Sequence, residues 1–304
     1  MAGDSSDVLV IGGSGQVGYH LRHAARQRGV PALGTFHTAA STGLRSLDVR
    51  DAQAVHRLVG EIAPSTILMP ASATNVDRCE EQPRATYAVN VAGLANVIAA
   101  ANVAAATLVY FSSDYIFDGR EGPYDERSPA NPICHYGTQK LIGEHLVLGQ
   151  ARDALIVRTT VVYGWEPQGK NFVNRLLRVL GAGERITVPE DQIGSPTYAP
   201  DLADATLELV EDGARGIVDV AGRELVARDE FAREAARVFG HDPALVDGVP
   251  TAALGQAAAR PLKAGMLVEL AERRLGRELV GYTAGLRRML SERPASQEDP
   301  DLAG

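Results

Sequence analysis

Short apolar runs alternate with longer stretches of helical spacing through the first part of the chain. The apolar runs, which predict strands, cover residues 8–11, 31–36, 44–49, 66–69, 107–112 and 154–159. Apolar positions recur every three or four residues over 16–28, 51–62, 84–105 and 136–149, which predicts helices. Strands separated by helices are typical of βαβ units. The pattern therefore predicts an α/β fold with a doubly wound parallel sheet.

Three glycines follow the first predicted strand at the spacing G-x-x-G-x-x-G. In such a loop the first glycine permits a tight turn, the second lets the backbone approach a pyrophosphate, and the third allows close helix–strand packing. The helix that follows offers free N–H groups and the positive end of its dipole to an anion. The loop thus predicts a Rossmann-like dinucleotide site. Its predicted cofactor-binding residues are Gly12, Gly15, Gln16, Val17 and Gly18.

The end of the second predicted strand, residues 34–38, carries no carboxylate. An acidic residue there would bind the adenosine ribose and favour NAD. His37 and Thr38 suit a 2′-phosphate better, so the sequence favours NADPH and leaves NADH open. Asp48 and Val49, after the third strand, are predicted to meet the adenine. Ala71, Ser72 and Ala73, after the fourth strand, are predicted to line the cofactor groove, with Asn90 beneath it.

The pattern loosens after residue 160. Helices are predicted over 172–180, 200–211, 229–239 and 262–275, and a short strand over 185–189. We expect a Rossmann domain at 1–160 and a smaller, mainly substrate-binding lobe at 161–290, from which some chain returns to the first domain. Residues 291–304 are polar and contain prolines, which predicts a flexible tail.

Composition excludes several classes of protein. The chain has 304 residues, of which 45% are hydrophobic and 22% charged, and its net charge of −8 gives no case for binding nucleic acid or an anionic membrane. Cys79 and Cys134 form no C-x-x-C pair, and the seven histidines show no ligand spacing, so we expect no metal. The apolar run at 8–11 is too short for a signal peptide or a span. We expect a cytoplasmic protein without a membrane segment.

Tyr136 and Lys140 form a Y-x-x-x-K pair on a predicted helix, so their side chains point the same way. An ammonium beside a phenol is expected to lower the phenol's pKa from about 10. Such a phenol can exchange a proton with a substrate alcohol or ketone. Ser113 ends the fifth predicted strand, at the sheet edge where doubly wound folds bind ligands. The three residues are the predicted catalytic set.

Several motifs together give a resemblance to a known family. They are S-S-D-Y-I-F-D-G at 112–119, P-Y-D-E at 123–126, N-P at 131–132, R-T-T-V-V-Y at 158–163, N-F at 171–172, D-Q-I-G-S-P-T at 191–197 and R-P at 260–261. With the glycine loop and the Tyr/Lys pair, they make the chain similar to the extended short-chain dehydrogenase/reductases. Within these, it most resembles the dTDP-4-dehydrorhamnose reductases and related deoxysugar 4-ketoreductases, over about residues 8–290.

The resemblance implies NADPH-dependent reduction of the 4-keto group of a nucleotide-activated 4-keto-6-deoxy sugar. It implies that Tyr136 donates the proton, that Lys140 contacts the nicotinamide ribose, and that Ser113 orients the carbonyl. The residues that it assigns to the substrate are Asp114, Tyr115, Val161, Asn171, Gln192, Thr197 and Arg260, the last of them at the diphosphate.

Two departures from the family pattern leave the sugar open. Val161 replaces a tryptophan, and Lys263 follows the R-P motif where an Asn-Ser pair is usual. A sugar-nucleotide epimerase on the same scaffold remains an alternative, as does a non-catalytic regulatory subunit like the β subunit of methionine adenosyltransferase. Cys134 and His135 stand where a dehydratase would carry an acidic pair, which argues against dehydration. The sequence leaves a homodimer open.

Overall fold

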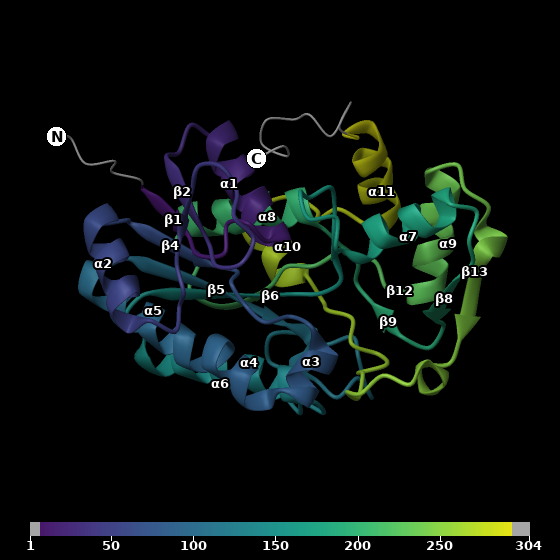
Figure 1. The fold of residues 1–304 in the computed structure, drawn as a ribbon, viewed down its shortest axis with the longest axis horizontal. Coiled ribbons are helices and arrows are strands. Elements are labelled where there is room, and N and C mark those ends of the chain that lie inside the picture. Colours follow the sequence, from purple (N-terminus) through teal and green to yellow (C-terminus); the bar gives the residue numbers. More distant parts are fainter. Residues whose placement is uncertain (1–6, 294–304) are drawn as a thin grey trace.

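The computed structural model describes residues 7–293, and its centre is a parallel sheet of seven strands (Figure 1). The strands lie in the order β11-β6-β5-β4-β1-β2-β3. Their bounds are β1 Val8–Val10, β2 Ala32–Phe36, β3 Leu44–Ser46, β4 Thr66–Met69, β5 Thr107–Ser113, β6 Ala154–Thr159 and β11 Gly216–Asp219. The order reverses between β1 and β4, which creates the crevice where doubly wound sheets bind ligands. The α/β Rossmann-like prediction is confirmed.

Alternate residues of each strand enter two separate cores, as the twofold period of a strand requires. Val8 and Val10 pack on one face with α1 (Gln16–Gln27) and α8 (Ala199–Glu211). Leu9 packs on the other face. The helices of that second face are α2 Ala52–Ile62, α5 Leu94–Ala104 and α6 His135–Gln150. Figure 1 shows α1 and α8 on one side of the sheet and α5 and α6 on the other.

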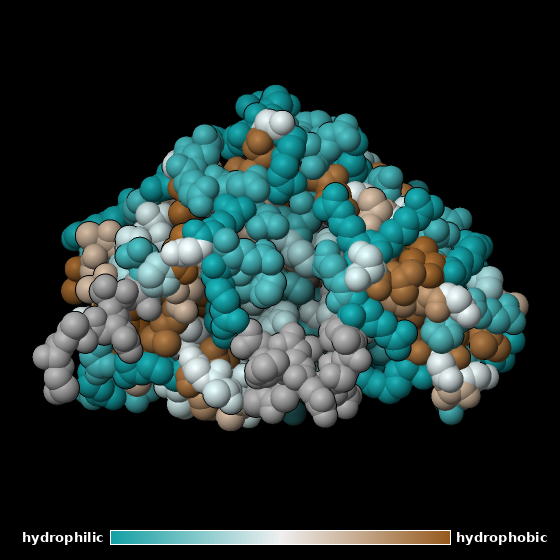
Figure 2. Space-filling view, turned by 90° about the horizontal axis from the view of Figure 1, so that it is seen from above, coloured by the Kyte–Doolittle hydropathy of each residue, from teal (hydrophilic) through white to brown (hydrophobic). Residues whose placement is uncertain are grey.

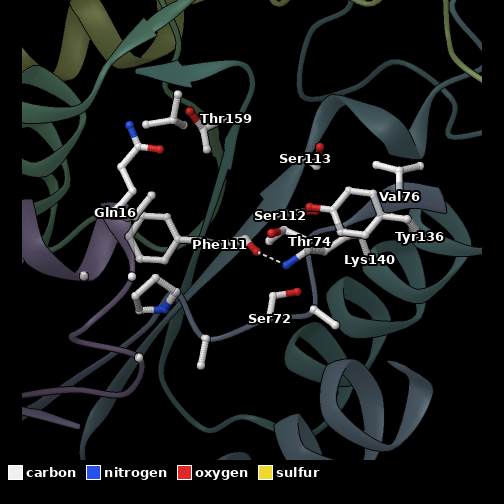
Figure 3. A pocket seen from close by; sticks show the side chains of 18 of the residues that line it. Gln16, Ser72, Thr74, Val76, Phe111, Ser112, Ser113, Tyr136, Lys140 and Thr159 are labelled. Carbon is white, nitrogen blue, oxygen red and sulfur yellow. Dashed lines mark hydrogen bonds between the residues drawn. The ribbon is translucent and has the colours of Figure 1, made fainter. Parts of the chain in front are cut away.

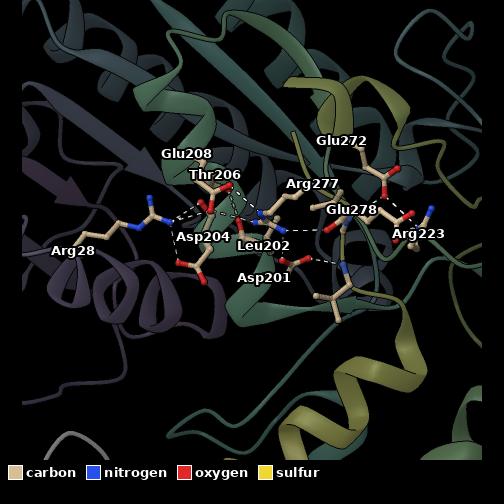
Figure 4. Close-up of polar contacts among 12 residues, drawn as sticks. Arg28, Asp201, Leu202, Asp204, Thr206, Glu208, Arg223, Glu272, Arg277 and Glu278 are labelled. Atoms are coloured by element: carbon tan, nitrogen blue, oxygen red, sulfur yellow. Dashed lines mark hydrogen bonds and ion pairs between the residues drawn. The ribbon is translucent and has the colours of Figure 1, made fainter. Parts of the chain in front are cut away.

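Part of the C-terminal half packs on the sheet. After α8, strand β11 pairs with β6, and α10 (Glu269–Leu275) packs against α8. Arginine-centred ion pairs join these segments (Figure 4). Arg28 of α1 contacts Asp204 and Glu208 of α8, and Arg277 contacts Glu208 and Asp201. The network fixes α8 between the N-terminal helix and the last part of the chain.

A second, smaller core lies beside the sheet. It is built by α7 (Phe172–Gly181), α9 (Arg228–Val238) and α11 (Tyr282–Ser291), around the buried side chains of Phe231 and Tyr163. Three strand pairs complete this lobe. They are β7 (Val162–Tyr163) with β10 (Thr197–Tyr198), β8 (Ile186–Pro189) with β13 (Val246–Val249), and β9 (Ile193–Gly194) with β12 (Val226–Ala227).

The helix predicted over 262–275 is wrong in its first half, because only α10 is helical there. Residues 262–268 are not helical, because several of their backbone groups pair with other segments. Lys263 bridges Ile193 and Met266 bridges Tyr124, and the Tyr124 N–H donates to the Gly265 carbonyl. Spacing alone cannot distinguish such a strap from the start of a helix.

The helix predicted over 84–105 is confirmed as one continuous helical stretch, Pro83–Ala104, with a π-helical turn inside it. The stretch consists of α4 (Pro83–Tyr87), the π-helical turn η1 (Ala88–Gly93) and α5, and a short α3 (Val76–Glu81) precedes it. Within residues 7–293, Pro83–Ala104 is the one helical stretch whose length and composition would suit a membrane span. Core helices of soluble proteins pass the same test. The predicted tail lies, from residue 294 on, outside the described residues.

Candidate active site

A cavity of about 760 Å³ runs along the carboxyl ends of the sheet strands and continues under the lobe. The sheet contributes the glycine loop and the ends of β2, β4 and β5, and the lobe contributes residues of β9, β12 and α9. The face of the molecule seen in Figure 2 is largely hydrophilic, with small separate hydrophobic patches. The cavity therefore joins two regions that lie far apart in sequence.

The glycine loop has no room for side chains. Gly12 has a φ of +95°, and a Cβ there would lie 2.8 Å from the Cα of Ala71. A Cβ on Gly18 would lie 2.2 Å from the Gly12 carbonyl oxygen. Gly15 is the N-cap of α1, and no side chain caps the first turn. The open helix end and the bare loop together fit a pyrophosphate. All five predicted loop residues line the cavity.

The adenosine end of the cavity carries opposite charges. His37, Thr38, Asp48 and Val49 all line it, as does Arg50, which sequence reasoning missed. The Arg50 guanidinium donates to the Asp48 carboxylate at 2.7 and 2.9 Å, and this holds the pKa of Asp48 down to about 2. The His37 ring lies 3.5 Å from the same carboxylate. The two basic side chains leave this corner without a free carboxylate.

Asn90 lies behind the cofactor groove rather than in it. Its buried side-chain oxygen accepts hydrogen bonds from the Ser72 hydroxyl at 2.9 Å and from the Ala73 N–H at 2.7 Å. Its amide donates to the Ala73 carbonyl and to Gln139 of α6. Ala71, Ser72 and Ala73 do line the cavity. Asn90 therefore positions this segment against the helix that bears the Tyr/Lys pair.

The predicted catalytic residues come together on one wall. Figure 3 shows Ser113, Tyr136 and Lys140 on one side of the pocket, with Gln16 and Thr159 on the other. Tyr136 and Lys140 are nearly fully buried on α6, and the Lys140 ammonium donates to the Phe111 carbonyl of β5 at 2.8 Å. The ammonium lies 5.8 Å from the centre of the Tyr136 ring.

The expected lowering of the phenol's pKa is not found. Burial, followed by the charge of Asp114, raises the pKa of Tyr136, and a hydrogen bond with Ser113 opposes this only in part. Burial also lowers the pKa of Lys140 to about 8. A buried pair resists charge separation because both ions lose their hydration. Tyr136 is therefore held in its protonated form.

Asp114 and Tyr115 line the cavity beside this wall. The Asp114 carboxylate accepts hydrogen bonds from the Ser113 hydroxyl at 2.9 Å and from the Thr160 hydroxyl at 2.6 Å. Burial raises the pKa of Asp114 to about 6, although these two donors oppose the shift. The Tyr115 ring meets the Tyr136 ring edge-on, with the ring centres 5.5 Å apart. Asp114 thus fixes the Ser113 hydroxyl, and Tyr115 packs against the phenol.

The structure gives three of the predicted substrate residues other contacts. Asn171 caps α7: its side chain accepts from the Asn174 N–H and donates to the Gly164 carbonyl. Thr197 is buried, donates to the Ser195 carbonyl and accepts from the Gly222 N–H. Arg260 forms an ion pair with Asp77 at 2.9 Å. None of the three lines the cavity, because each side chain is engaged in holding loops together.

Val161 and Gln192 do line the cavity. Val161 has a φ of +45°, an outlier for a β-branched residue, at the point where the chain leaves the sheet for the lobe. The Gln192 side-chain amide donates to the Thr251 hydroxyl at 3.0 Å. Val161 and Gln192 thus line the cavity from segments that connect the sheet with the lobe or belong to the lobe.

Three buried polar atoms on the cavity wall have no hydrogen-bond partner within the described residues. They are the side-chain nitrogen of Gln16 and the hydroxyls of Ser112 and Thr159. Buried polar groups are rarely left unpaired. Together with the bare glycine loop, they indicate that this wall is built to receive a polar ligand the size of a dinucleotide.

Comparison with known proteins identifies the family. The family model described as RmlD substrate binding domain matches residues 6–294. The chain belongs to this family. The dTDP-4-dehydrorhamnose reductase of Escherichia coli is 32% identical over 298 residues, which cover 94% of this chain and 97% of that one. The probable low-salt glycan biosynthesis reductase Agl14 of Haloferax volcanii is 31% identical over 275 residues, 88% of this chain and 92% of its own.

Solved structures agree with this membership. The dTDP-4-dehydrorhamnose reductase of Bacillus anthracis, in complex with NADP, matches with a TM-score of 0.86 and 31% identity, over 94% of this chain and 98% of that one. The UDP-glucose 4-epimerase of Thermus thermophilus has a TM-score of 0.78 over 95% of this chain and 99% of that one, but only 22% identity, so it shows the shared fold alone.

Members of the RmlD family can thus be recognised from motifs, but Gln168 and Arg228 are among the cavity residues of this chain that lie outside them. Gln168 reaches from the lobe to the glycine loop, where its amide donates to the Ser14 carbonyl at 2.6 Å. Arg228, the first residue of α9, also lines the cavity. Neither belongs to a motif with recognisable spacing, so no signal in the sequence could have found them.

Proposed function

We propose that this protein reduces the 4-keto group of a nucleotide-activated 4-keto-6-deoxy sugar with NADPH. The observation that carries the proposal is the meeting of Ser113, Tyr136 and Lys140 on one wall of a cavity whose other end is the glycine loop. Membership of the RmlD family supports the same activity, because relatives named dTDP-4-dehydrorhamnose reductase are 31–35% identical over most of the chain.

The residues have distinct roles in the proposed reaction. NADPH, when bound, supplies the hydride that the carbonyl carbon accepts. Tyr136 donates its proton to the carbonyl oxygen, and its raised pKa keeps that proton in place until negative charge develops. Ser113 would orient the carbonyl oxygen by turning its one hydroxyl proton from the Asp114 carboxylate, its acceptor here, to that oxygen. The Lys140 ammonium stabilises the phenolate left after transfer.

Cofactor binding rests on both ends of the cavity. The glycine loop and the start of α1 would hold the pyrophosphate, and Ser72, Ala73 and the unpaired wall hydroxyls would face the nicotinamide half. At the other end, His37, Thr38 and Arg50 would bind the 2′-phosphate. A basic corner without a free carboxylate favours NADPH over NADH.

The remaining predictions are part of the proposal. The Rossmann domain is taken as residues 1–160 and the mainly substrate-binding lobe as 161–290. The proposed protein works in the cytoplasm without membrane or nucleic acid, and a homodimer is compatible with this activity. Its substrate is a nucleotide sugar, bound in the part of the cavity beneath β9, β12 and α9.

Consumption of NADPH tests the activity. The protein is mixed with NADPH and a dTDP-4-keto-6-deoxy sugar, and absorbance at the reduced nicotinamide band is followed while mass spectrometry records the sugar. Stoichiometric NADPH loss and a product two hydrogens heavier are expected. An epimerase would change the sugar without net NADPH loss, and a binding module would bind NADPH and leave the sugar unchanged. Either result would refute the proposal.

A further inference from the structure

The cavity contains one basic side chain that the protein leaves unpaired. Arg228 is half-buried, and its guanidinium lies 5.2 Å from the centre of the Phe172 ring. Its backbone N–H donates to the Gln192 carbonyl at 2.9 Å. Within residues 7–293, its side chain makes no hydrogen bond or ion pair. Arginine at such a position normally engages a carboxylate or phosphate, because its planar group presents several donors in a fixed geometry.

Four other cations in or beside the cavity each have a hydrogen-bond or ion-pair partner. Arg50 is bound by Asp48, and the Lys140 ammonium donates to the Phe111 carbonyl. Arg78, on α3, donates to the Gln82 side chain at 3.4 Å. Arg260, the cation that the sequence suggested for the diphosphate, is paired with Asp77 and is not among the residues that line the cavity. Among these five cations, Arg228 alone has no side-chain hydrogen bond or ion pair within residues 7–293.

The position of Arg228 is fixed by the lobe rather than by the sheet. It directly follows β12, whose residue Val226 pairs with Gly194 of β9, and both of these residues line the cavity. The glycine loop belongs to the opposite, N-terminal part of the cavity wall. An anion held by Arg228 would therefore be a second anion, separate from the cofactor's pyrophosphate.

The electrostatic surroundings also favour an anion. Burial lowers the pKa of Arg228, while the nearby Tyr115 and Asp114 oppose that shift. Asp114 is itself occupied by the Ser113 and Thr160 hydroxyls, so it does not neutralise the guanidinium directly. A partly desolvated charge without a partner is unfavourable, and a bound anion would relieve it.

We propose that Arg228 binds the diphosphate of the nucleotide-sugar substrate. The inference rests on the proposed function, because the substrate's two phosphates are the anion that such a substrate would bring into the lobe side of the cavity. The cation–π contact with Phe172 helps to hold the guanidinium at this place, and the Gln192 carbonyl holds the Arg228 backbone. Arg228 is thus a substrate-binding residue that takes the role the sequence assigned to Arg260.

Binding of dTDP, thymidine and NADP⁺, each measured by calorimetry, tests this assignment. R228Q keeps a polar side chain but removes the charge, and R228K keeps the charge but loses the planar geometry. We expect R228Q to weaken dTDP binding about tenfold or more, and R228K to weaken it less. Thymidine and NADP⁺ should bind each variant as they bind the wild type. R237Q, on the exposed part of the same helix, is the matched control.

The outcomes separate the two proposals. Unchanged dTDP affinity in R228Q, with an unchanged melting temperature, would overturn the role of Arg228, as would equal losses of dTDP and NADP⁺ affinity. R260Q losing dTDP affinity while R228Q keeps it would return the diphosphate to Arg260. If the wild type fails to reduce the keto sugar yet binds dTDP through Arg228, the proposed activity fails alone. A wild type that binds none of dTDP, UDP, GDP and CDP would overturn both.

Discussion

The two walls of the cavity are made in different ways. The sheet side presents backbone: Gly12 and Gly18 bring the chain so close to itself that no Cβ fits, and the open N-terminus of α1 faces the cavity. The lobe side presents long side chains, among them Gln168, Gln192 and Arg228, from loops and helix starts. A backbone site tolerates almost no substitution, whereas a side-chain site can be changed one residue at a time without losing the fold.

This difference suggests a division of labour. One solved relative, the reductase of Bacillus anthracis, is in complex with NADP. A backbone cradle recognises a pyrophosphate through N–H groups that are present whatever the side chains are, proline excepted. Sugars and nucleotides vary, and side chains on loops can vary with them. The predictions below test whether the sheet side and the lobe side can be impaired separately.

The largest effect is expected at the wall where the two sides meet. Tyr136→Phe removes the proton donor and leaves the ring in its contact with Tyr115. We expect kcat to fall by about two to four orders of magnitude, the usual contribution of a general acid. NADPH affinity should be nearly unchanged. Steady-state kinetics and cofactor titration measure the two quantities.

Tyr87→Phe is the control, because Tyr87 is 46% exposed and lies outside the cavity lining. It should leave both kcat and NADPH affinity as they are. A Tyr136→Phe variant that turns over at close to the wild-type rate would remove Tyr136 from the chemistry.

The next largest effect is expected in the glycine loop. In Gly18→Ala the new Cβ would lie 2.2 Å from the Gly12 carbonyl oxygen, so the loop must move. We expect NADPH affinity to fall at least about tenfold, or about 1.4 kcal/mol. dTDP affinity should fall less, because the lobe holds the nucleotide sugar. Fluorescence titration and calorimetry measure these affinities.

Gly60→Ala is the matched control, since a Cβ at this exposed position of α2 meets no atom within 4 Å. Replacing glycine by alanine inside a helix should raise the stability by a few tenths to about 1 kcal/mol. If dTDP and NADPH affinities fall equally in Gly18→Ala, the two sides are not separable.

Much of the sheet could be predicted from the sequence. The predicted strands 66–69 and 154–159 match Thr66–Met69 and Ala154–Thr159 to the residue. Asp51, the first residue of the predicted helix 51–62, caps α2 by accepting a hydrogen bond from the Ala54 N–H. Buried strands give short apolar runs with clear ends, so they can be recognised in the sequence. The seventh strand, Gly216–Asp219, was missed because only its last two residues are fully buried.

Less of the lobe side could be predicted, and the reason is physical. Asn171 precedes a predicted helix, which is also the pattern of an N-cap, and the structure shows that capping is its contact. No neighbouring residue in the sequence distinguishes Arg228 from the other arginines. That its side chain lines the cavity without a partner depends on where β9 and β12 meet. Contacts of this kind are set by tertiary packing and leave no periodicity in the sequence.

A more moderate effect is expected at the adenosine end. Arg50→Ala removes a cation that lines the cavity and releases the Asp48 carboxylate. A free carboxylate would repel the 2′-phosphate, so we expect the preference for NADPH over NADH to fall about three- to tenfold. The kcat/KM ratio for the two cofactors measures it.

Arg45→Ala, which removes an exposed ion pair with Glu61 outside the cavity, should leave the preference unchanged. If the kcat/KM of the wild type for NADH exceeds that for NADPH by more than about tenfold, Asp48 rather than the basic residues binds the adenosine ribose.

The smallest effect is expected where the lobe touches the glycine loop. The Gln168 amide donates to the Ser14 carbonyl at 2.6 Å, and the buried Glu166 carboxylate holds this turn by accepting the Gln168 N–H at 2.7 Å. Gln168→Ala removes two hydrogen bonds, the one to Ser14 and the one that the Gln168 side-chain oxygen accepts from Lys170. Only the first touches the glycine loop, and it contributes about 1 kcal/mol, so NADPH affinity should fall roughly fivefold. Trp165 is the only tryptophan of the chain, so its fluorescence reports this turn directly. Gln27→Ala, on the exposed end of α1, is the control. An altered tryptophan signal with unchanged NADPH affinity would mean that the lobe touches the cofactor loop without supporting it, and the two walls would then be independent.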